Sequence, residues 1–242
     1  MIKYYFHQKI SILLSFLIIN NYLILSLNLP LLFIKINFIV FLLTIIFFYI
    51  KNIKENIYLK LFFLFLIFIA LGEPTHSWDA RSIWLFHAKR IFYENSIFYG
   101  ANNYAPFSHN AYPTIAPALA SSFAVLVGHW NEVFPKLSFT LMFLPPLIIS
   151  YIFFKNNYYL AFLALLFFTI GNYLFNGWMD GLVAVYFCLS SFLMYILIVD
   201  EKGIYEKNIF LYLLTFFFFI TLTLIKNEGI AMLAILFLIT FL

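Results

Sequence analysis

The sequence predicts an all-α, polytopic membrane protein, and three observations support this fold class. Hydrophobic residues make up 65% of the chain and charged residues 10%, against roughly 45–50% and 25% in soluble domains. Apolar stretches close to the roughly 20 residues that cross a bilayer follow one another along the chain, and basic residues gather between them. We therefore expect a single transmembrane domain over residues 1–242, with about eight spans and additional amphipathic helices at the membrane surface.

The first two expected spans are Ile10–Leu29 and Leu31–Ile50. Asn20 and Asn21 weaken the first span, and Lys35 stands close enough to the start of the second to reach the interface. The basic start and apolar stretch resemble a signal peptide, but no small-x-small cleavage site follows. We interpret this segment as a retained signal anchor.

Basic residues predict the orientation. The segment 51–60, which leads into a third span at Ile57–Leu71, is rich in lysine. By the positive-inside rule, the N-terminus and this segment lie in the cytoplasm, which in a bacterium places the protein in the inner membrane. The lysines assigned to the cytoplasmic side are Lys3, Lys9, Lys51, Lys54, Lys60, Lys155, Lys202 and Lys207. The acids assigned to the periplasmic side, together with all four tryptophans, are Glu73, Asp79, Glu94, Glu132, Asp180 and Glu228.

The third span leads to a polar island, Glu73–Pro117, on the periplasmic side. The island holds both arginines and three of the five histidines of a chain that is otherwise apolar. We therefore expect any chemistry to depend on this periplasmic loop and its juxtamembrane helix.

An amphipathic helix is predicted near the start of the island. Its apolar positions recur at helical spacing and are Ala80, Ile83, Trp84, Ala88, Ile91 and Phe92. The opposite face carries Arg81 and Lys89, with Arg90 near the end, so the helix would lie on the outer membrane surface. Asp79 is either a first-turn carboxylate that satisfies backbone N–H groups, or a general base or metal ligand beside a lipid-facing cavity.

The segment Thr114–Gly128 leaves the island and allows two topologies. About 15 residues are short for a span but adequate for a re-entrant or interface-lying helix. Pro113 and Pro117 mark its rigid start, and His109 stands shortly before them. We favour a helix that does not cross, because the acids and tryptophans then share one face.

The remaining expected spans are Phe134–Phe154, Tyr158–Phe175, Gly181–Val199, Ile209–Ile225 and Ile230–Leu242. The last has about 13 residues, fewer than the roughly 20 that cross a bilayer. We therefore expect the sequence to end inside a membrane helix and to be the N-terminal portion of a longer protein.

Polar residues flank three of these spans. Lys136 would either contact a lipid phosphate or extend to the interface. Asp180, between two spans, is either a turn residue or a second functional acid that meets Asp79. Lys226 and Glu228 interrupt the last apolar region, either as an ordinary turn or as a buried pair at a substrate cavity.

The composition also argues against some functions. The net charge of +4 is spread over short segments without a Lys/Arg run, so nucleic-acid binding is unsupported. The single cysteine, Cys188, rules out an internal disulfide, and its apolar surroundings predict a core position.

The order of these elements resembles bacterial GT-C-type membrane glycosyltransferases, relatives of protein O-mannosyltransferases and aminoarabinose transferases. The residues that carry the resemblance are Trp78, Asp79, Ala80, Ile83, Trp84, Ala88, Lys89, His109, Tyr112, Pro113, Pro117, Glu132, Lys136, Gly177, Asp180 and Lys226–Gly229. They cover most of the chain from Glu73 onward, and the order of five weak motifs carries the resemblance rather than any single one.

The resemblance implies a multi-span helical fold whose first large periplasmic loop carries an essential carboxylate, matched here by Asp79. It matches Asp180 to a second acid in a later loop, and His109–Pro113 to the element that ends the first loop. Some relatives bind a divalent metal near these acids and others do not. The chain departs from the superfamily in having additional spans before the island and a shorter length.

The implied reaction is inverting transfer of a sugar from a polyprenyl-phosphate donor to a lipid, glycan or protein acceptor. Asp79 and Asp180 are the expected catalytic acids, with Asp79 activating the acceptor hydroxyl and the donor phosphate near Lys226, Lys136 or Arg81. The residues expected to bind substrate are Arg81, Trp84, Lys89, His109, Tyr112, Lys136, Lys226 and Glu228. Two alternatives stay open: a transporter or flippase of a lipid-linked or polar solute, in which Lys226 and Glu228 form a coupled pair, and an inactive truncated remnant.

Overall fold

The protein is helical, as predicted. The computed structural model describes residues 2–51, 57–98, 106–153, 157–199 and 209–241, and those ranges contain no strand. The α-helices are α1 Ile2–Ser26, α2 Leu31–Ile50, α3 Ile57–Gly72, α4 Leu85–Glu94, α5 Ile115–Val127, α6 Phe134–Leu141, α7 Leu144–Phe153, α8 Asn157–Phe175, α9 Met179–Val199, α10 Ile209–Ile225 and α11 Asn227–Phe241. A π-turn, η1 (Ala80–Trp84), and a 3₁₀ turn, η3 (Pro106–Ser108), lie between α3 and α5.

Five helical segments are long and apolar enough to cross a membrane: Phe6–Ser26, Leu31–Ile50, Phe134–Tyr151, Tyr158–Phe175 and Met179–Ile198. The helices α3, α10 and α11 are also apolar but shorter, with 16, 17 and 15 residues. The prediction of a membrane protein made of successive apolar helices is therefore confirmed at this level.

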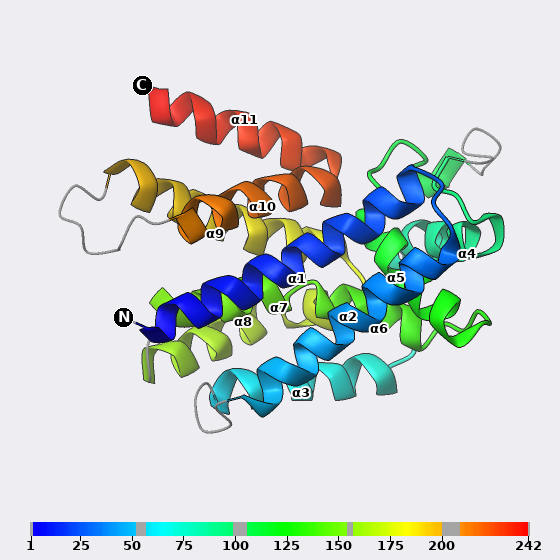
Figure 1. Ribbon diagram of the computed structural model, residues 1–242, viewed down its shortest axis with the longest axis horizontal. Helices are drawn as coiled ribbons and strands as arrows, with labels where there is room; N and C mark the ends of the chain where they lie inside the picture. The colour runs from blue at the N-terminus through cyan, green and yellow to red at the C-terminus, as the bar shows by residue number, and fades with distance from the viewer. Residues whose placement is uncertain (1, 52–56, 99–105, 154–156, 200–208, 242) are drawn as a thin grey trace.

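Most of the longer helices run back and forth along the long axis of the molecule (Figure 1). The α1–α2 connection and α4 lie at one end of the bundle, whereas the N-terminus lies at the other. The α10–α11 connection points toward the end that holds α4. Four lysines of the predicted charge asymmetry, Lys54, Lys155, Lys202 and Lys207, lie outside the described residues, as does the segment 99–105 of the island.

Asn20 and Asn21 join the first helix to its neighbours. The Asn20 amide donates to Asn37 Oδ1 of α2 at 2.7 Å. The Asn21 amide donates to the Ala118 carbonyl of α5 at 3.0 Å, and the Ser122 hydroxyl donates back to Asn21 Oδ1 at 3.0 Å. Because apolar surroundings offer no other partners, these bonds connect α1 to α2 and α5.

The region predicted as one span, Phe134–Phe154, contains a break between α6 and α7. Pro145 and Pro146 follow the break directly, and proline cannot continue a helix from the preceding turn but fits the first turn of a new one. The Tyr186 hydroxyl of α9 donates to the carbonyl of Met142 at 3.1 Å, which satisfies a backbone group at the break.

Two predictions about α9 are wrong. The helix begins at Met179 rather than Gly181, so Asp180 lies in its first turn instead of in a loop between spans. A carboxylate is favourable there, because the first turn carries the positive end of the helix dipole. Cys188 is exposed on the surface of α9 rather than in the core.

The short helix α5 lies inside the protein. Its residues from Ile115 to Val125 are all buried, and it packs against α1, α2, α4 and α6. Just before α5, the Tyr112 ring stacks on Trp84 of η1, and just after it, Trp130 packs on Phe92 of α4. Both ends of α5 therefore meet the same helical segment of the island.

The reversal between α10 and α11 depends on a glycine. Gly229 passes so close to the Leu222 carbonyl of α10 that a Cβ at this position would collide with it. The Gly229 N–H donates to the Lys226 carbonyl at 2.9 Å. This tight hairpin holds the Lys226 side chain at the connection between the two helices.

Candidate functional site

The candidate site is built on the island helix, which we define as residues 78–94, comprising a first turn, η1 and α4. The N–H of Ala80 donates to the Ser77 hydroxyl at 3.4 Å, so Ser77 caps the helix. Asp79 makes no capping hydrogen bond, and the interpretation of its carboxylate as the cap is wrong. Within the described residues, the Asp79 carboxylate has no hydrogen-bond or ion-pair partner.

The island helix contains a π-turn close to Asp79. The Leu85 N–H bonds to the carbonyl of Ala80, five residues earlier, and turns of this kind are frequent at functional sites. Trp84 is fully buried, whereas Arg81 and Lys89 are exposed on the opposite face. The predicted amphipathic helix is confirmed for these residues.

The side chains of Arg90 and His87 bond to other residues of the island rather than facing a cavity. The buried Arg90 guanidinium lies 3.2 Å from the Glu94 carboxylate and donates to the Ile97 carbonyl at 2.7 Å, so its predicted place beside the exposed cations is wrong. The Nε2 of His87 lies 2.8 Å from the Ser108 carbonyl. Burial is the main reason that the pKa of His87 is lowered; the Ser108 bond opposes this effect and the Arg90 charge adds to it. A neutral His87 that donates from Nε2 fits this geometry.

Three aromatic side chains stack at the start of α5. The Tyr112 ring lies 4.8 Å from the His109 ring and 5.6 Å from the Trp84 ring, with interplanar angles of 11° and 16°. His109 adopts a left-handed backbone conformation, with φ of 48°, which turns the chain before Tyr112. The stack brings the predicted binding residues His109, Tyr112 and Trp84 together.

Lys226 lies beside this stack with two carboxylates, and we call Lys226, Asp180, Glu228 and Tyr112 the Lys226 cluster. The Lys226 ammonium is 2.7 Å from Asp180 Oδ1, 3.4 Å from Glu228 Oε1 and 5.6 Å from the centre of the Tyr112 ring. The Lys226 side chain is 13% exposed, whereas those of Asp180 and Glu228 are 52% and 51% exposed. The predicted pair of Lys226 and Glu228 is therefore present, but Glu228 is half exposed rather than buried. Asp180, which was expected to meet Asp79, contacts Lys226 instead.

The carboxylates keep Lys226 charged. Partial burial is the largest single influence and lowers its pKa, but the Asp180 hydrogen bond and the charges of Asp180 and Glu228 outweigh it, so the pKa of Lys226 is raised. An ammonium with two carboxylates at this range has its charge largely compensated.

The turn before Asp180 packs directly on the start of the island helix. Gly177 has a φ of 85°, and a Cβ there would lie 2.9 Å from the Cβ of Ala80. Asp79 and Asp180 therefore stand on two segments in direct contact. Both acids belong to the same end of the bundle.

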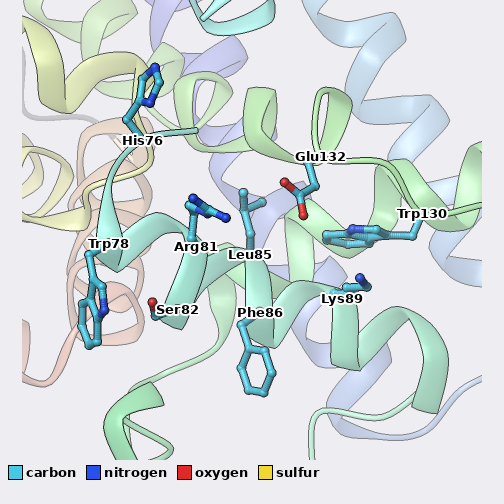
Figure 2. Close-up of a pocket in the computed structure, with 9 residues that line it drawn as sticks. All are labelled: His76, Trp78, Arg81, Ser82, Leu85, Phe86, Lys89, Trp130 and Glu132. Carbon is cyan, nitrogen blue, oxygen red and sulfur yellow. The ribbon is translucent and has the colours of Figure 1, made fainter. Parts of the chain in front are cut away.

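A second feature is a cavity of about 450 Å³ beside the island helix, which we call the Arg81 pocket. It is lined by His76, Trp78, Arg81, Ser82, Leu85, Phe86, Lys89, Trp130 and Glu132. Figure 2 shows Arg81 and Lys89 on one wall, formed by the island helix, and Glu132 and Trp130 on the facing wall. The connection between α5 and α6 supplies the facing wall.

Lys136 does not join either group. Its side chain is buried, and its ammonium donates to the carbonyl of Glu73 at the start of the island. This contact ties the beginning of α6 to the end of α3. The lysine is already engaged by the backbone, so its predicted role as a contact for a lipid phosphate receives no support.

The described acids do not fit a metal centre. Within the described residues, no group of three or more His, Cys, Asp or Glu side chains has the arrangement to hold a metal ion. Asp180 and Glu228 share the Lys226 ammonium instead. We therefore derive no catalytic step through a metal.

The site residues predicted from the sequence include neither Trp130 nor Glu132, although Glu132 is among the residues that carry the resemblance. The six-residue connection between α5 and α6 (128–133) carries no local signal that would link it to Arg81, which lies about 50 positions earlier. By contrast, Arg81, Leu85 and Lys89 stand at i, i+4 and i+8, and this spacing indicates from the sequence alone that they share one face of a helix.

The fold and the site define a helical membrane protein with its candidate site at one end of an apolar bundle. The chain matches no protein-family model, and it matches neither a curated protein nor a solved structure.

Proposed function

We propose that the protein is a membrane glycosyltransferase that transfers a sugar from a polyprenyl-phosphate donor to an acceptor on the periplasmic face. One observation supports it above the others: stretches that are far apart in the sequence meet at one end of the bundle. Trp84, Tyr112 and His109 form a stack beside Lys226, whose ammonium contacts Asp180. These are the dispersed residues on which the resemblance to GT-C-type enzymes rests.

Asp79 is the better candidate for the general base. Its carboxylate is partly buried and has no partner within the described residues, so it is able to accept a proton from an acceptor hydroxyl. Asp180 is engaged by Lys226 at 2.7 Å, and a carboxylate held in this way is a weaker base. We assign Asp180 the role of positioning Lys226 near the Tyr112 stack.

The proposed topology has eight spans, an N-terminus in the cytoplasm of a bacterium and the island in the periplasm. The short helix α5 would be re-entrant, because both of its ends contact the island helix and its backbone is buried within the protein. Such a helix keeps the Lys226 cluster and Asp79 on one side of the membrane.

The experiment is transfer activity of Asp79→Asn in membranes, with a panel of polyprenyl-phosphate hexoses and pentoses labelled in the sugar. We expect a loss of at least about 100-fold, because general acid–base catalysis typically contributes 10²–10⁴-fold. Glu73→Gln is the matched control, since it removes an exposed acid of the same island. Labelled product from Asp79→Asn near the wild-type level, at equal expression, contradicts the proposal.

Solute movement and sugar product, measured on the same variants, distinguish a transporter from a glycosyltransferase. A transporter with a coupled Lys226–Glu228 pair predicts that Lys226→Gln and Glu228→Gln abolish solute movement while no sugar product forms with any variant. A glycosyltransferase predicts product with the unaltered protein and a larger loss for Asp79→Asn than for Glu228→Gln.

A further inference from the structure

We propose that the Arg81 pocket binds a phosphate ester carried on an apolar chain. The polyprenyl phosphate of a sugar donor and the headgroup of a membrane phospholipid share this chemistry. The inference goes beyond glycosyl transfer, because a phosphate site of this kind holds whether or not a sugar is transferred.

The lining of the Arg81 pocket has more cations than carboxylates. The pocket is lined by two cations, Arg81 and Lys89, and by one carboxylate, Glu132. Among the described residues, neither cation forms an ion pair or a hydrogen bond. The pocket therefore carries a net positive charge that an anion would compensate.

Two buried N–H donors at or beside the Arg81 pocket have no hydrogen-bond partner among the described residues. The indole N–H of Trp130 is buried and has no hydrogen-bond partner in the described part of the chain, and the amide nitrogen of the adjacent Asn131 is in the same state. Buried donors in proteins are almost always paired, so an acceptor is expected near Trp130, which lines the pocket. A phosphate offers only acceptors and suits a site made of donors.

The shape of the pocket supports a ligand with an apolar part. Arg81 and Lys89 stand eight positions apart, about 12 Å along the helix axis, and Leu85 lies between them. Phe86 and Trp78 add apolar surface to the lining (Figure 2). A cavity of about 450 Å³ exceeds what one phosphate fills and leaves space for the start of a chain or a sugar.

The other cations of this end of the bundle suit the role less well. Lys226 already has Asp180 and Glu228 within 3.4 Å, and Lys136 is buried and bonded to the Glu73 carbonyl. Only the Arg81 pocket combines uncompensated cations, a cavity and an unpaired buried donor among the described residues.

The test is binding of farnesyl phosphate to the purified full chain in detergent micelles, measured by native mass spectrometry. Farnesol, which lacks the phosphate, is the ligand control. We expect Arg81→Gln/Lys89→Gln to weaken farnesyl phosphate binding by about tenfold or more, which corresponds to at least about 1.4 kcal/mol, because the phosphate loses both cations of the lining. Lys35→Gln, which removes an exposed cation at the start of α2, should bind like the unaltered chain.

Two single variants sharpen the test. Trp130→Phe keeps the ring but removes the indole N–H, and a several-fold weaker binding is expected. Glu132→Gln removes the only carboxylate of the lining and should tighten binding, since it would otherwise repel the phosphate. Equal affinity for farnesol and farnesyl phosphate, or binding that is lost in Lys226→Gln but kept in Arg81→Gln/Lys89→Gln, overturns the proposal.

Competition tests whether the apolar chain is required. Displacement by short-chain phosphatidic acid but not by inorganic phosphate identifies a lipid phosphate, whereas displacement by inorganic phosphate at similar concentration contradicts the need for an apolar chain. Binding is measured without an acceptor, so a failure of sugar transfer leaves this result standing. Conversely, equal binding of farnesyl phosphate by the unaltered chain and by Arg81→Gln/Lys89→Gln would overturn the phosphate site and leave the role of Asp79 intact.

Discussion

The two polar groups at the island end of the bundle hold their cations in opposite ways. Lys226 lies between the carboxylates of Asp180 and Glu228, so its charge is compensated within the protein. Arg81 and Lys89 face a cavity with a single carboxylate, and no described residue pairs with either of them. The comparison teaches that a compensated lysine organises the protein itself, whereas uncompensated cations beside a cavity are available to a ligand.

The difference follows from which elements meet. The α10–α11 hairpin brings Lys226 to the first turn of α9, where an acid already stabilises the helix end. The island helix instead faces the α5–α6 connection, which supplies Glu132 and Trp130 (Figure 2). The following predictions test this contrast, beginning with the largest expected effect on stability.

The first prediction concerns the hairpin that positions Lys226. Gly229→Leu should lower the free energy of unfolding by about 3 kcal/mol, because its side chain would collide with the Leu222 carbonyl and force the helices apart. The measurement is thermal or denaturant unfolding in detergent. Gly72→Ala is the control, since a Cβ at Gly72 meets no atom within 4 Å. Equal stability of the two variants would show that the hairpin does not hold Lys226 in place.

The second prediction compares the two kinds of lysine directly. Lys226→Met should lower the free energy of unfolding by about 1 kcal/mol, because it leaves Asp180 and Glu228 without their partner while both are half exposed. Lys89→Met should change it by roughly 0–0.5 kcal/mol, as expected for an exposed residue without a pair. Unfolding curves of both variants provide the measurement. A larger loss for Lys89→Met would reverse the assignment of the two regions.

The third and smallest effect is a pH dependence. The pKa of Lys226 is raised in the folded protein above its ordinary value of 10.5. Its contribution to stability is therefore complete below pH 10.5 and is lost as the pH rises from there through the folded pKa. The difference in melting temperature between the unaltered chain and Lys226→Met should stay constant from about pH 8 to pH 10 and shrink above it. A difference that shrinks below pH 10 would contradict a raised pKa.

The helices were largely predictable, because long apolar runs leave the backbone few alternatives to a helix in lipid. The start of α9 was misjudged, since an acid such as Asp180 is compatible with both a loop and a first helical turn. The break between α6 and α7 had a visible cause in Pro145 and Pro146, whereas the bond that the Tyr186 hydroxyl donates to the Met142 carbonyl comes from α9 and was not predictable. The hydrogen bonds of Asn20 and Asn21 were not predictable, because their partners come from α2 and α5.

Some features of the candidate site were also predictable from the sequence, and others were not. The sequence alone marked Asp79, Arg81 and Lys89 as polar residues at the start of one amphipathic helix, because helical spacing is a local property. It also marked the stretch around Lys226 as unusual for an apolar region. Which cation is compensated depended on tertiary structure, because Lys226 meets Asp180, which lies 46 positions earlier in the sequence.

By itself, the sequence determined the helical class, the membrane environment and the polar island, since hydrophobicity and helical periodicity act over short stretches of chain. Only the tertiary structure decided that Lys226 is held by two acids while Arg81 and Lys89 face a cavity. The physical reason is that the charge state and availability of a side chain depend on neighbours within a few ångströms. Those neighbours are set by how α5, α9 and α11 pack at one end of the bundle.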